Sequence, residues 1–360
     1  MDKKFLILDC YVDEPACFGV PPFISPYPRY LYGALVDAGV YPDRIAYMTI
    51  EGLRERGFII DGPAAMVFLI GGAAVPGKYL GHRIGTVPEM EKILETNRRL
   101  RFCTGGTAAH FLDPGRHPNL TPVRGDIEKF AYGLARGTAD PGARRNYEEL
   151  SRWAPPGAAV CALHPGHPHL IAEIETYRGC PRLEHCSFCS EGALNALEFR
   201  RAEDILAEID ALIARGMSRF RIGRQADILQ YGTAYSDFRN GFPRPSPPAV
   251  TALFGELKRR RDEGHIVTLN VDNANPGTLF NFPDESALIL ESIAAAVTPG
   301  DTLALGVESL DPAVIRENRL KVNLEELIDA VSLVNEIGGK RIGGLPALLP
   351  GVNLIHGLAG

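Results

Sequence analysis

Short apolar runs and stretches with helical spacing alternate along residues 1–150 of the chain. The runs at 5–10 and 65–70 are almost uninterrupted, as in strands that are buried on both faces. Residues 28–38 and 88–100 carry apolar positions three and four apart, the spacing of an amphipathic helix. Alternating strands and helices are typical of a parallel sheet with helices on both faces. The pattern therefore predicts an α/β domain at 1–150, doubly wound and Rossmann-like.

The alternation resumes near residue 171 with longer helices and continues to the end of the chain. Five strands are expected, at 171–177, 219–222, 265–271, 302–307 and 352–358. Four helices are expected between them, at 202–215, 250–263, 285–296 and 323–337. Asn323 and Glu326 have the spacing of a capping box at the start of the last helix. The repeated unit predicts a partial (β/α) barrel, TIM-like, at 171–360.

The residues between these two regions, 151–170, are rich in Pro, Gly and Ala, as in WAPPGAA and HPGHPH. This composition predicts an extended linker. Its histidines His164, His167 and His169 are candidate metal ligands. The prolines beside them favour an extended connector instead.

Glycine pairs directly follow two apolar strands of the first domain, in GGAAVPGKYLG at 71–81 and TGGTAAH at 104–110. Such turns let backbone N–H groups approach a ligand at the carboxyl ends of parallel strands. Tight strand-to-helix turns without a ligand are the alternative. Neither turn has the G-x-G-x-x-G dinucleotide pattern or the P-loop pattern.

The net charge of −6 argues against broad capture of nucleic acid by a basic surface. No apolar run reaches the roughly 18 residues of a membrane span, and the N-terminal apolar stretch is too short for a signal peptide. We therefore expect a cytoplasmic protein without a membrane partner. The seven cysteines, an odd number with three in one cluster, favour metal binding or catalysis over disulfides.

The clustered cysteines Cys180, Cys186 and Cys189 have the spacing C-x5-C-x2-C, and they follow the first strand of the predicted barrel. Structural zinc sites usually have four protein ligands. His185 is adjacent to Cys186, which strains tetrahedral chelation by both. Three thiolates on a [4Fe–4S] cluster would leave one iron open to a ligand that is not protein.

The segment ETYRGC…CSFC, followed by a (β/α) repeat, resembles the radical S-adenosylmethionine enzymes. The resemblance implies that the three cysteines hold a [4Fe–4S] cluster and that S-adenosylmethionine chelates its fourth iron. It also implies a 5′-deoxyadenosyl radical and a reductant such as ferredoxin or flavodoxin. The commonest spacing of that superfamily is C-x3-C-x2-C, and the first gap here is longer. The substrate, whether small molecule or macromolecule, stays open.

The resemblance extends along the barrel. IGRQADI stands where the superfamily has a Gly-Gly-Glu-like turn, NVDNANP holds Asn270 and Asp272, and LGVESLD resembles a Gly-x-Glu-Ser segment. Asn318 and Lys321 lie in the segment that follows it. Contacts to S-adenosylmethionine are implied for Phe188, Gly223, Arg224, Gln225, Asn270, Glu308 and Ser309. The superfamily barrel usually has six strands, so we expect a longer natural protein or an element that covers the last edge.

A doubly wound domain ahead of such a barrel resembles the cobalamin-binding subgroup. This implies that the glycine turns cradle cobalamin through Gly71, Gly72, Thr104, Gly105 and Gly106. The Asp-x-His-x-x-Gly motif is absent, so the cobalamin has no histidine lower ligand, or the domain has kept the fold and lost the ligand. The function expected is a transferase reaction, cobalamin-dependent methyl transfer, or another C–H functionalisation.

Two alternatives remain. A methylthiotransferase-like RNA modifier would carry three further cysteines in the first domain, which has only Cys10, Cys17 and Cys103 in no matching arrangement. A non-catalytic iron–sulfur or zinc module would have a fully coordinated metal. The scattered cysteines, including Cys161, are expected to be buried structural thiols.

Overall fold

The structure is a computed structural model, and it describes residues 4–11, 23–62, 64–72, 84–106 and 110–360. The chain divides into two compact units. The first comprises residues 1–172 with 207–217, and the second comprises 173–206 with 218–360.

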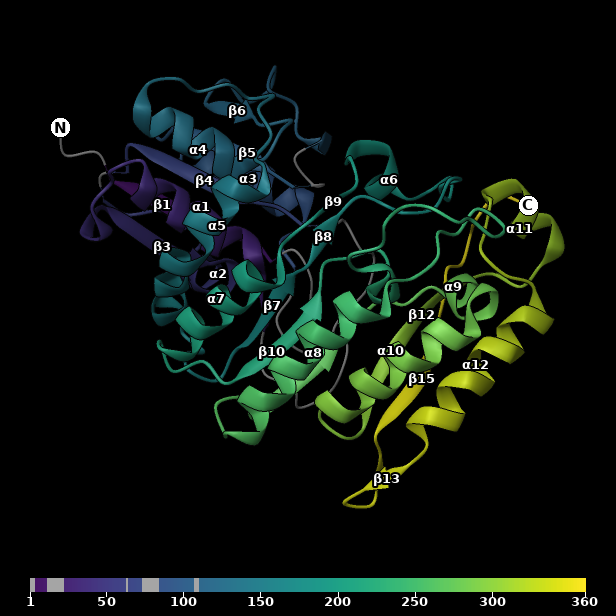
Figure 1. Cartoon of the computed structure of the whole chain (residues 1–360). Helices are drawn as coiled ribbons and strands as arrows, with labels where there is room; N and C mark the ends of the chain where they lie inside the picture. The colour runs from purple at the N-terminus through teal and green to yellow at the C-terminus, as the bar shows by residue number, and fades with distance from the viewer. Residues whose placement is uncertain (1–3, 12–22, 63, 73–83, 107–109) are drawn as a thin grey trace. The chain divides into compact units, whose positions relative to one another are not determined.

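The first unit is built on a parallel five-stranded sheet in the order β3-β1-β4-β5-β6 (Figure 1). Its strands are β1 (Phe5–Asp9), β3 (Ile45–Thr49), β4 (Met66–Ile70), β5 (Phe102–Gly105) and β6 (Leu120–Pro122). Its helices are α1 (Pro26–Asp37), α2 (Ile50–Glu55), α3 (Val87–Thr96), α4 (Ile127–Arg136) and α5 (Tyr147–Gly157). Short 3-10 turns lie at Pro42–Arg44 and Ala158–Leu163. All residues of β1 and β5 are buried, which confirms the doubly wound α/β fold.

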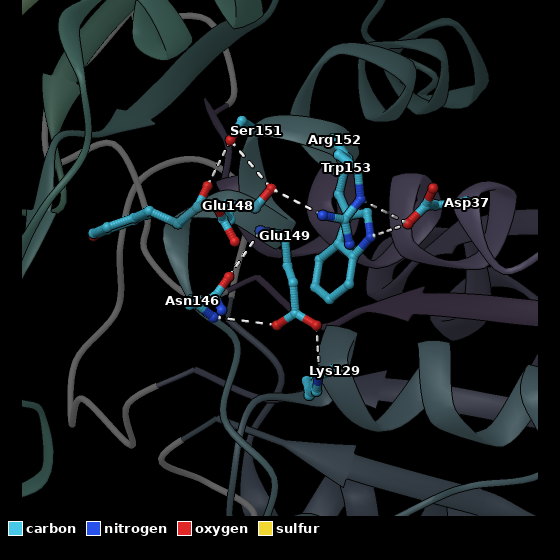
Figure 2. Close-up of polar contacts among 9 residues, drawn as sticks. Asp37, Lys129, Asn146, Glu148, Glu149, Ser151, Arg152 and Trp153 are labelled. Atoms are coloured by element: carbon cyan, nitrogen blue, oxygen red, sulfur yellow. Dashed lines mark hydrogen bonds and ion pairs between the residues drawn. The ribbon is translucent and has the colours of Figure 1, made fainter.

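The expected linker at 151–170 is wrong for its first part, because α5 and the following 3-10 turn occupy residues 147–163. A capping box starts α5: Glu149 N donates to Asn146 Oδ1 at 2.9 Å, and Asn146 N donates to Glu149 Oε2 at 3.2 Å (Figure 2). Lys129 also pairs with Glu149, and the buried Trp153 donates its Nε1–H to Asp37 at 2.9 Å.

Glycines explain why a Pro- and Gly-rich segment forms a packed helix. A Cβ on Gly33 of α1 would fall 1.9 Å from the Trp153 carbonyl oxygen, and one on Gly157 would fall 2.1 Å from the Arg29 carbonyl oxygen. The two helices therefore approach at backbone distance, and small residues serve packing. Residues 164–169 have no helix or strand.

The second unit contains strands in the order β7-β10-β11-β12-β15 (Figure 1). They are β7 (Ile171–Glu175), which enters from the first unit, β10 (Arg219–Gly223), β11 (Thr268–Val271), β12 (Asp301–Glu308) and β15 (Leu348–Leu354). β10 pairs in parallel with β11, the Ala274–Leu305 bridge continues the parallel order, and β12 pairs in parallel with β15. This is the expected partial barrel. The fifth strand, predicted at 352–358, lies at 348–354: it begins at the buried Leu348, and residues 355–358 fall outside it.

The helices of this unit are α6 (Ser190–Leu194), α7 (Ala202–Ile213), α8 (Pro247–Asp262), α9 (Pro276–Asn281), α10 (Pro283–Ala296), α11 (Pro312–Asn318) and α12 (Leu324–Gly338). The second half of α7 belongs to the first unit. Smaller elements are β2 (Phe23–Ile24), which pairs with β7 inside the first unit, β8 (Tyr177–Arg178), β9 (Glu198–Phe199), β13 (Arg341–Ile342), β14 (Leu345–Pro346) and a 3-10 turn at Ile228–Gln230. The predicted capping box of α12 is confirmed, since Asn323 and Glu326 exchange both bonds.

β12 has two unlike faces. Leu303, Leu305 and Val307 point to one side and are fully buried, whereas Thr302 and Glu308 on the other side are at least partly exposed. We call these the apolar face and the polar face of the barrel strands. Among the residues that the structure describes, no helix is both long and apolar enough to cross a membrane.

Candidate functional site

The cysteine loop starts at Gly179, just after β7 and β8. Gly179 has φ +84°, and a Cβ there would fall 2.7 Å from the Ala196 carbonyl oxygen, so only glycine fits without strain. Its N–H donates to the Glu191 carboxylate at 2.8 Å, which closes the loop against α6. The loop therefore leaves the barrel at the carboxyl end of the first barrel strand, where β/α barrels build their active sites.

The three thiols of this loop are free, and they interact electrostatically. Cys186 is buried, whereas Cys180 and Cys189 are partly exposed. Burial raises the pKa of Cys180 to about 11; Arg182 opposes this rise, and the Cys189 and Cys186 thiols add to it. Over the described ranges, no three His, Cys, Asp or Glu side chains are arranged to hold a single metal ion. A [4Fe–4S] cluster does not require its cysteines to converge on one metal ion, since each thiolate binds a separate iron.

The cysteine loop is tied to the end of α11. Ser187, between Cys186 and Cys189, donates its N–H to the Asn318 carbonyl oxygen at 3.2 Å and its hydroxyl to Asn318 Oδ1 at 2.8 Å. Asn318 is buried, and its Nδ2 donates to the Val314 carbonyl oxygen at 2.9 Å. The loop and the segment after β12 are therefore held together, although more than 120 residues separate them.

The carboxyl end of β12 presents the Glu308-Ser309 pair. A bulge lies between Gly306 and Glu308, and Glu308 has φ +71°, a left-handed conformation that is strained for a residue other than glycine. Lys321 Nζ donates to the Gly306 carbonyl oxygen at 2.8 Å and to Glu308 Oε1 at 2.9 Å. A Cβ on Gly306 would fall 2.7 Å from that Nζ, so the glycine makes room for the ion pair. Ser309 Oγ accepts the Asp311 N–H at 3.2 Å.

In the turn after β10, Gly223, Arg224 and Gln225 have different structural roles. A Cβ on Gly223 would fall 2.9 Å from Glu173 Oε1, so a β7 carboxylate occupies the space that Gly223 leaves. Arg224 has φ +54°. The buried Gln225 donates Nε2 to the carbonyl oxygens of Ile222 and Asp272, at 3.2 and 2.6 Å, and Oε1 accepts the Thr176 hydroxyl at 3.1 Å. Gln225 therefore ties the ends of β7, β10 and β11 together.

The remaining predicted residues of this unit lie on the polar face or on the loop. Asn270 donates to Asp301 at 2.8 Å, which joins it to the amino end of β12. Asp272 pairs with Arg221 of β10. Phe188 is 42% exposed, on the loop between Cys186 and Cys189.

Two charged residues of the polar face, Glu173 and Arg221, are not among the site residues predicted from the sequence. Arg221 Nη1 lies 4.0 Å from Glu173 Oε1, and Glu173 is buried. The signal for Glu173 is present in the strand IAEIE, where acids alternate with apolar residues at the period of a strand. An acid on a strand that is buried on both sides is unusual enough to mark a site.

The glycine turns of the first unit lie against each other. Gly71 N donates to the Gly105 carbonyl oxygen at 3.0 Å. Gly106 has φ +86°, and a Cβ on it would fall 1.8 Å from the Gly71 carbonyl oxygen, so glycine is required for the close approach. Gly72 is buried beside them, and the parts of both turns at 73–81 and 107–109 lie outside the described residues.

Thr104, at the end of β5, has a fully buried hydroxyl. Its Oγ1 has no hydrogen-bond partner within the part of the chain that the structure describes. Leaving a buried polar atom unpaired costs free energy, so such an atom needs an explanation, a bound ligand being one.

The scattered cysteines and the histidines show no metal-binding geometry in the described ranges. Cys10, Cys103 and Cys161 are buried free thiols, and burial raises the pKa of Cys161 to about 11 and that of Cys103 to about 12. Cys17 lies outside the described residues. His164 Nδ1 accepts the Gly166 N–H at 2.9 Å, and His167 Nε2 bonds the Arg215 carbonyl oxygen at 2.7 Å.

Comparison with known proteins gives the family. The profile of the radical SAM superfamily matches residues 174–356, half of the chain, and covers the end of β7, the cysteine loop and the four later barrel strands. The chain belongs to the radical SAM superfamily. Membership implies a [4Fe–4S] cluster and S-adenosylmethionine as cofactors and supports an enzyme.

Two curated relatives match the whole chain or nearly all of it. An uncharacterized protein of Methanocaldococcus jannaschii is 39% identical over 380 residues, which cover 100% of this chain and 69% of the relative. One of Archaeoglobus fulgidus is 37% identical over 360 residues, which cover 99% of this chain and 65% of the relative. The relative from Archaeoglobus fulgidus is therefore about one and a half times as long as this chain.

Two solved structures share the fold of the chain. The radical S-adenosylmethionine methyltransferase TsrM from Kitasatospora setae, with cobalamin and a [4Fe–4S] cluster bound, aligns with a TM-score of 0.62 at 14% identity, over 99% of this chain and 70% of its own. The cobalamin-dependent S-adenosylmethionine radical enzyme OxsB, with aqua-cobalamin and S-adenosylmethionine bound, aligns with a TM-score of 0.67 at 13% identity, over 98% and 49%. At these identities the likeness is one of fold.

Proposed function

We propose that Cys180, Cys186 and Cys189 hold the [4Fe–4S] cluster of a radical S-adenosylmethionine enzyme that carries out cobalamin-dependent methyl transfer or another C–H functionalisation. The observation that carries the proposal is the three-thiol loop at the carboxyl end of the first barrel strand, tied through Ser187 to Asn318. Three thiols from the protein suit a cluster that keeps one iron for another ligand. When bound, the cluster supplies one electron to S-adenosylmethionine.

The residues at the carboxyl ends of the barrel strands suit a zwitterionic cofactor. Glu308 and Lys321 are paired at 2.9 Å, both are mostly shielded from solvent, and the strained backbone of Glu308 holds its carboxylate in place. We propose that the Lys321–Glu308 pair orients the ribose and carboxylate groups, while backbone carbonyl oxygens of the turn at Gly223 and Arg224 accept from the methionyl amino end. Because charges are fixed before binding, little reorganisation is needed.

Cobalamin is proposed for the first unit on its sheet order. The order of strands reverses between β1 and β4, and ligands of such sheets bind outside the carboxyl ends at that point. Gly71 and Gly72 follow β4 directly, and the turn of Thr104, Gly105 and Gly106 adjoins them. The Thr104 hydroxyl, which has no partner among the described residues, is a fitting donor for a polar group of the cofactor. The structures of TsrM and OxsB, which share this fold, both contain cobalamin.

Anaerobic reconstitution with iron and sulfide tests the cluster assignment. The wild-type chain is expected to gain the broad visible absorbance of an iron–sulfur cluster and, with S-adenosylmethionine and a one-electron reductant of the flavodoxin or ferredoxin class, to release 5′-deoxyadenosine. Cys180→Ala, Cys186→Ala and Cys189→Ala should each lose the cluster. Cys161→Ala, a buried cysteine of the first unit, is the matched control. A cluster retained by any of the three variants removes that cysteine from the site.

Cobalamin binding is tested separately, by the visible spectrum of protein recovered after incubation with hydroxocobalamin. Thr104→Val removes the orphan hydroxyl at nearly constant volume, so the free protein should be no less stable, whereas cobalamin should bind more weakly. Thr121→Val, on an exposed position of the neighbouring strand β6, is the control. If wild-type protein recovers no cobalamin, the first unit has kept the fold without the ligand.

A further inference from the structure

Arg182 lies in the long gap between Cys180 and Cys186, and its side chain points back to the second cysteine. Its guanidinium Nη1 donates to Cys186 Sγ at 3.2 Å. Nη2 donates to the carbonyl oxygen of Arg319 at 3.2 Å and more weakly to that of Leu320 at 3.5 Å. The residue is 7% exposed, and its guanidinium carbon lies 5.0 Å from the centre of the Phe242 ring.

We propose that Arg182 is a positioning residue of the cluster: it fixes the Cys186 sulfur and raises the cluster's reduction potential. The inference rests on the proposed assignment of Cys186 as a ligand. An arginine keeps its charge at any working pH, and its planar fork can bond a sulfur and a carbonyl at once. Hydrogen bonds to ligand sulfurs are among the features that set the potential of iron–sulfur clusters.

The direction of the effect follows from charge. One-electron reduction makes the cluster more negative, and a fixed positive charge in hydrogen-bond contact with a ligand sulfur stabilises the reduced form more than the oxidised form. Burial strengthens this effect, because solvent screens a buried charge less. The aromatic ring of Phe242 holds the guanidinium without competing for its N–H groups.

The same side chain fixes the geometry of the loop. Arg319 caps α11 with φ +51°, and this left-handed turn carries one of the carbonyl oxygens that Arg182 bonds. Together with the Ser187–Asn318 bonds, Arg182 forms a second tie between the loop and the end of α11. A gap of only three residues between the first two cysteines would offer fewer positions for such a tie.

The test compares Arg182→Met, which removes the charge and every donor but keeps a similar stem, with Arg182→Lys, which keeps the charge. Arg260→Met is the matched control, since Arg260 is equally buried but lies on α8, bonded to Glu256. Midpoint potentials of the reconstituted clusters are measured by dye-mediated titration with dithionite. The expected order, from least to most negative, is wild type and Arg260→Met, then Arg182→Lys, then Arg182→Met. Equal potentials for wild type and Arg182→Met would overturn the inference.

A second measurement does not need the cluster. Amide hydrogen exchange of the apoprotein should become faster at Ser187 and Cys189 in Arg182→Met and stay unchanged in Arg260→Met. If Arg182→Met takes up no cluster, two other results test the role of Arg182: hydrogen exchange in the loop of Arg182→Met and the midpoint potential of Arg182→Lys. Unchanged exchange in Arg182→Met together with a wild-type potential in Arg182→Lys would count against the role. A wild-type chain that forms no cluster contradicts the proposed function, whereas a normal cluster with an unshifted potential contradicts only the role of Arg182.

Discussion

The sheets of the two units differ in what their strands can offer to chemistry. In the first unit, all residues of β1 and β5 are buried, so the apolar side chains of these strands are used for packing. In the second unit, β12 buries every other residue, and charged residues lie on β7 (Glu173), on β10 (Arg221) and just after β11 (Asp272). For binding a ligand, β1 and β5 therefore offer only their ends and the turns after them, whereas β12 offers one of its faces as well.

The largest expected effect tests this contrast with pairs of adjacent residues on one strand. Phe68 and Leu69 of β4 are both fully buried. Phe68→Ala should lower the free energy of unfolding of the first unit by about 3–5 kcal/mol and Leu69→Ala by about 2–5 kcal/mol, since both remove packed apolar volume. The only tryptophan, Trp153, lies in this unit, so urea unfolding followed by its fluorescence reports on the unit alone.

The matching pair in the second unit is Leu303 and Thr302 of β12. Leu303→Ala should cost about 2–5 kcal/mol, because Leu303 is fully buried on the apolar face. Thr302→Ala, on the exposed polar face, should change stability by no more than about 0.5 kcal/mol. Far-UV circular dichroism during urea unfolding measures both. A large loss in Thr302→Ala would mean that the polar face is packed as tightly as the sheet of the first unit.

A medium effect is expected from pH, and here the units should behave alike. Burial raises the pKa of Asp9, the last residue of β1, and of Asp227, after β10, from 3.8 to about 6 each. A carboxyl group with a raised pKa in the folded state favours folding most below pH 3.8, and this stability is lost as pH rises through about 6. At about 1.4 kcal/mol per pKa unit, each group accounts for about 3 kcal/mol.

Asp9→Asn and Asp227→Asn remove this titration and keep an oxygen that accepts hydrogen bonds. The stability of each variant relative to wild type should therefore increase between pH 4 and pH 7, by about 2.4 kcal/mol, since the rest of the change lies outside this range. Thermal unfolding at several pH values, with fluorescence for Asp9→Asn and circular dichroism for Asp227→Asn, gives the difference. Curves that stay parallel to the wild-type curve would place the pH dependence in other groups.

The smallest effect concerns the helix caps, where the two units are built from the same local signal. Asn146 starts α5 and Asn323 starts α12, each with a Glu three residues later and both reciprocal bonds formed. Asn146→Ala and Asn323→Ala should each lower stability by about 1 kcal/mol. Unequal losses in urea unfolding would show that tertiary packing holds one of the helices in place without its cap.

The expected linker shows where local composition misleads. Residues 151–163 contain Pro155, Pro156 and Gly157, which are typical of loops, yet they extend a helix that packs on α1. The glycines serve the close approach of two backbones, and the capping box of Asn146 and Glu149 starts the helix just before the expected boundary. In a sequence, small residues are typical both of loops and of closely packed helices, and only the presence of a partner helix distinguishes the two cases.

By itself the sequence determined the alternation of strands and helices in both regions, the capping box of α12, and the three-cysteine loop behind the first barrel strand. These depend on residues close together in the chain, where periodicity and spacing are sufficient. Only the tertiary structure decided that Ser187 and Arg182 meet the end of α11, that Glu173 fills the space beside Gly223, and that Gln225 ties three strand ends together. Contacts between segments distant in sequence depend on strand register and on close backbone approach, and no local pattern encodes these.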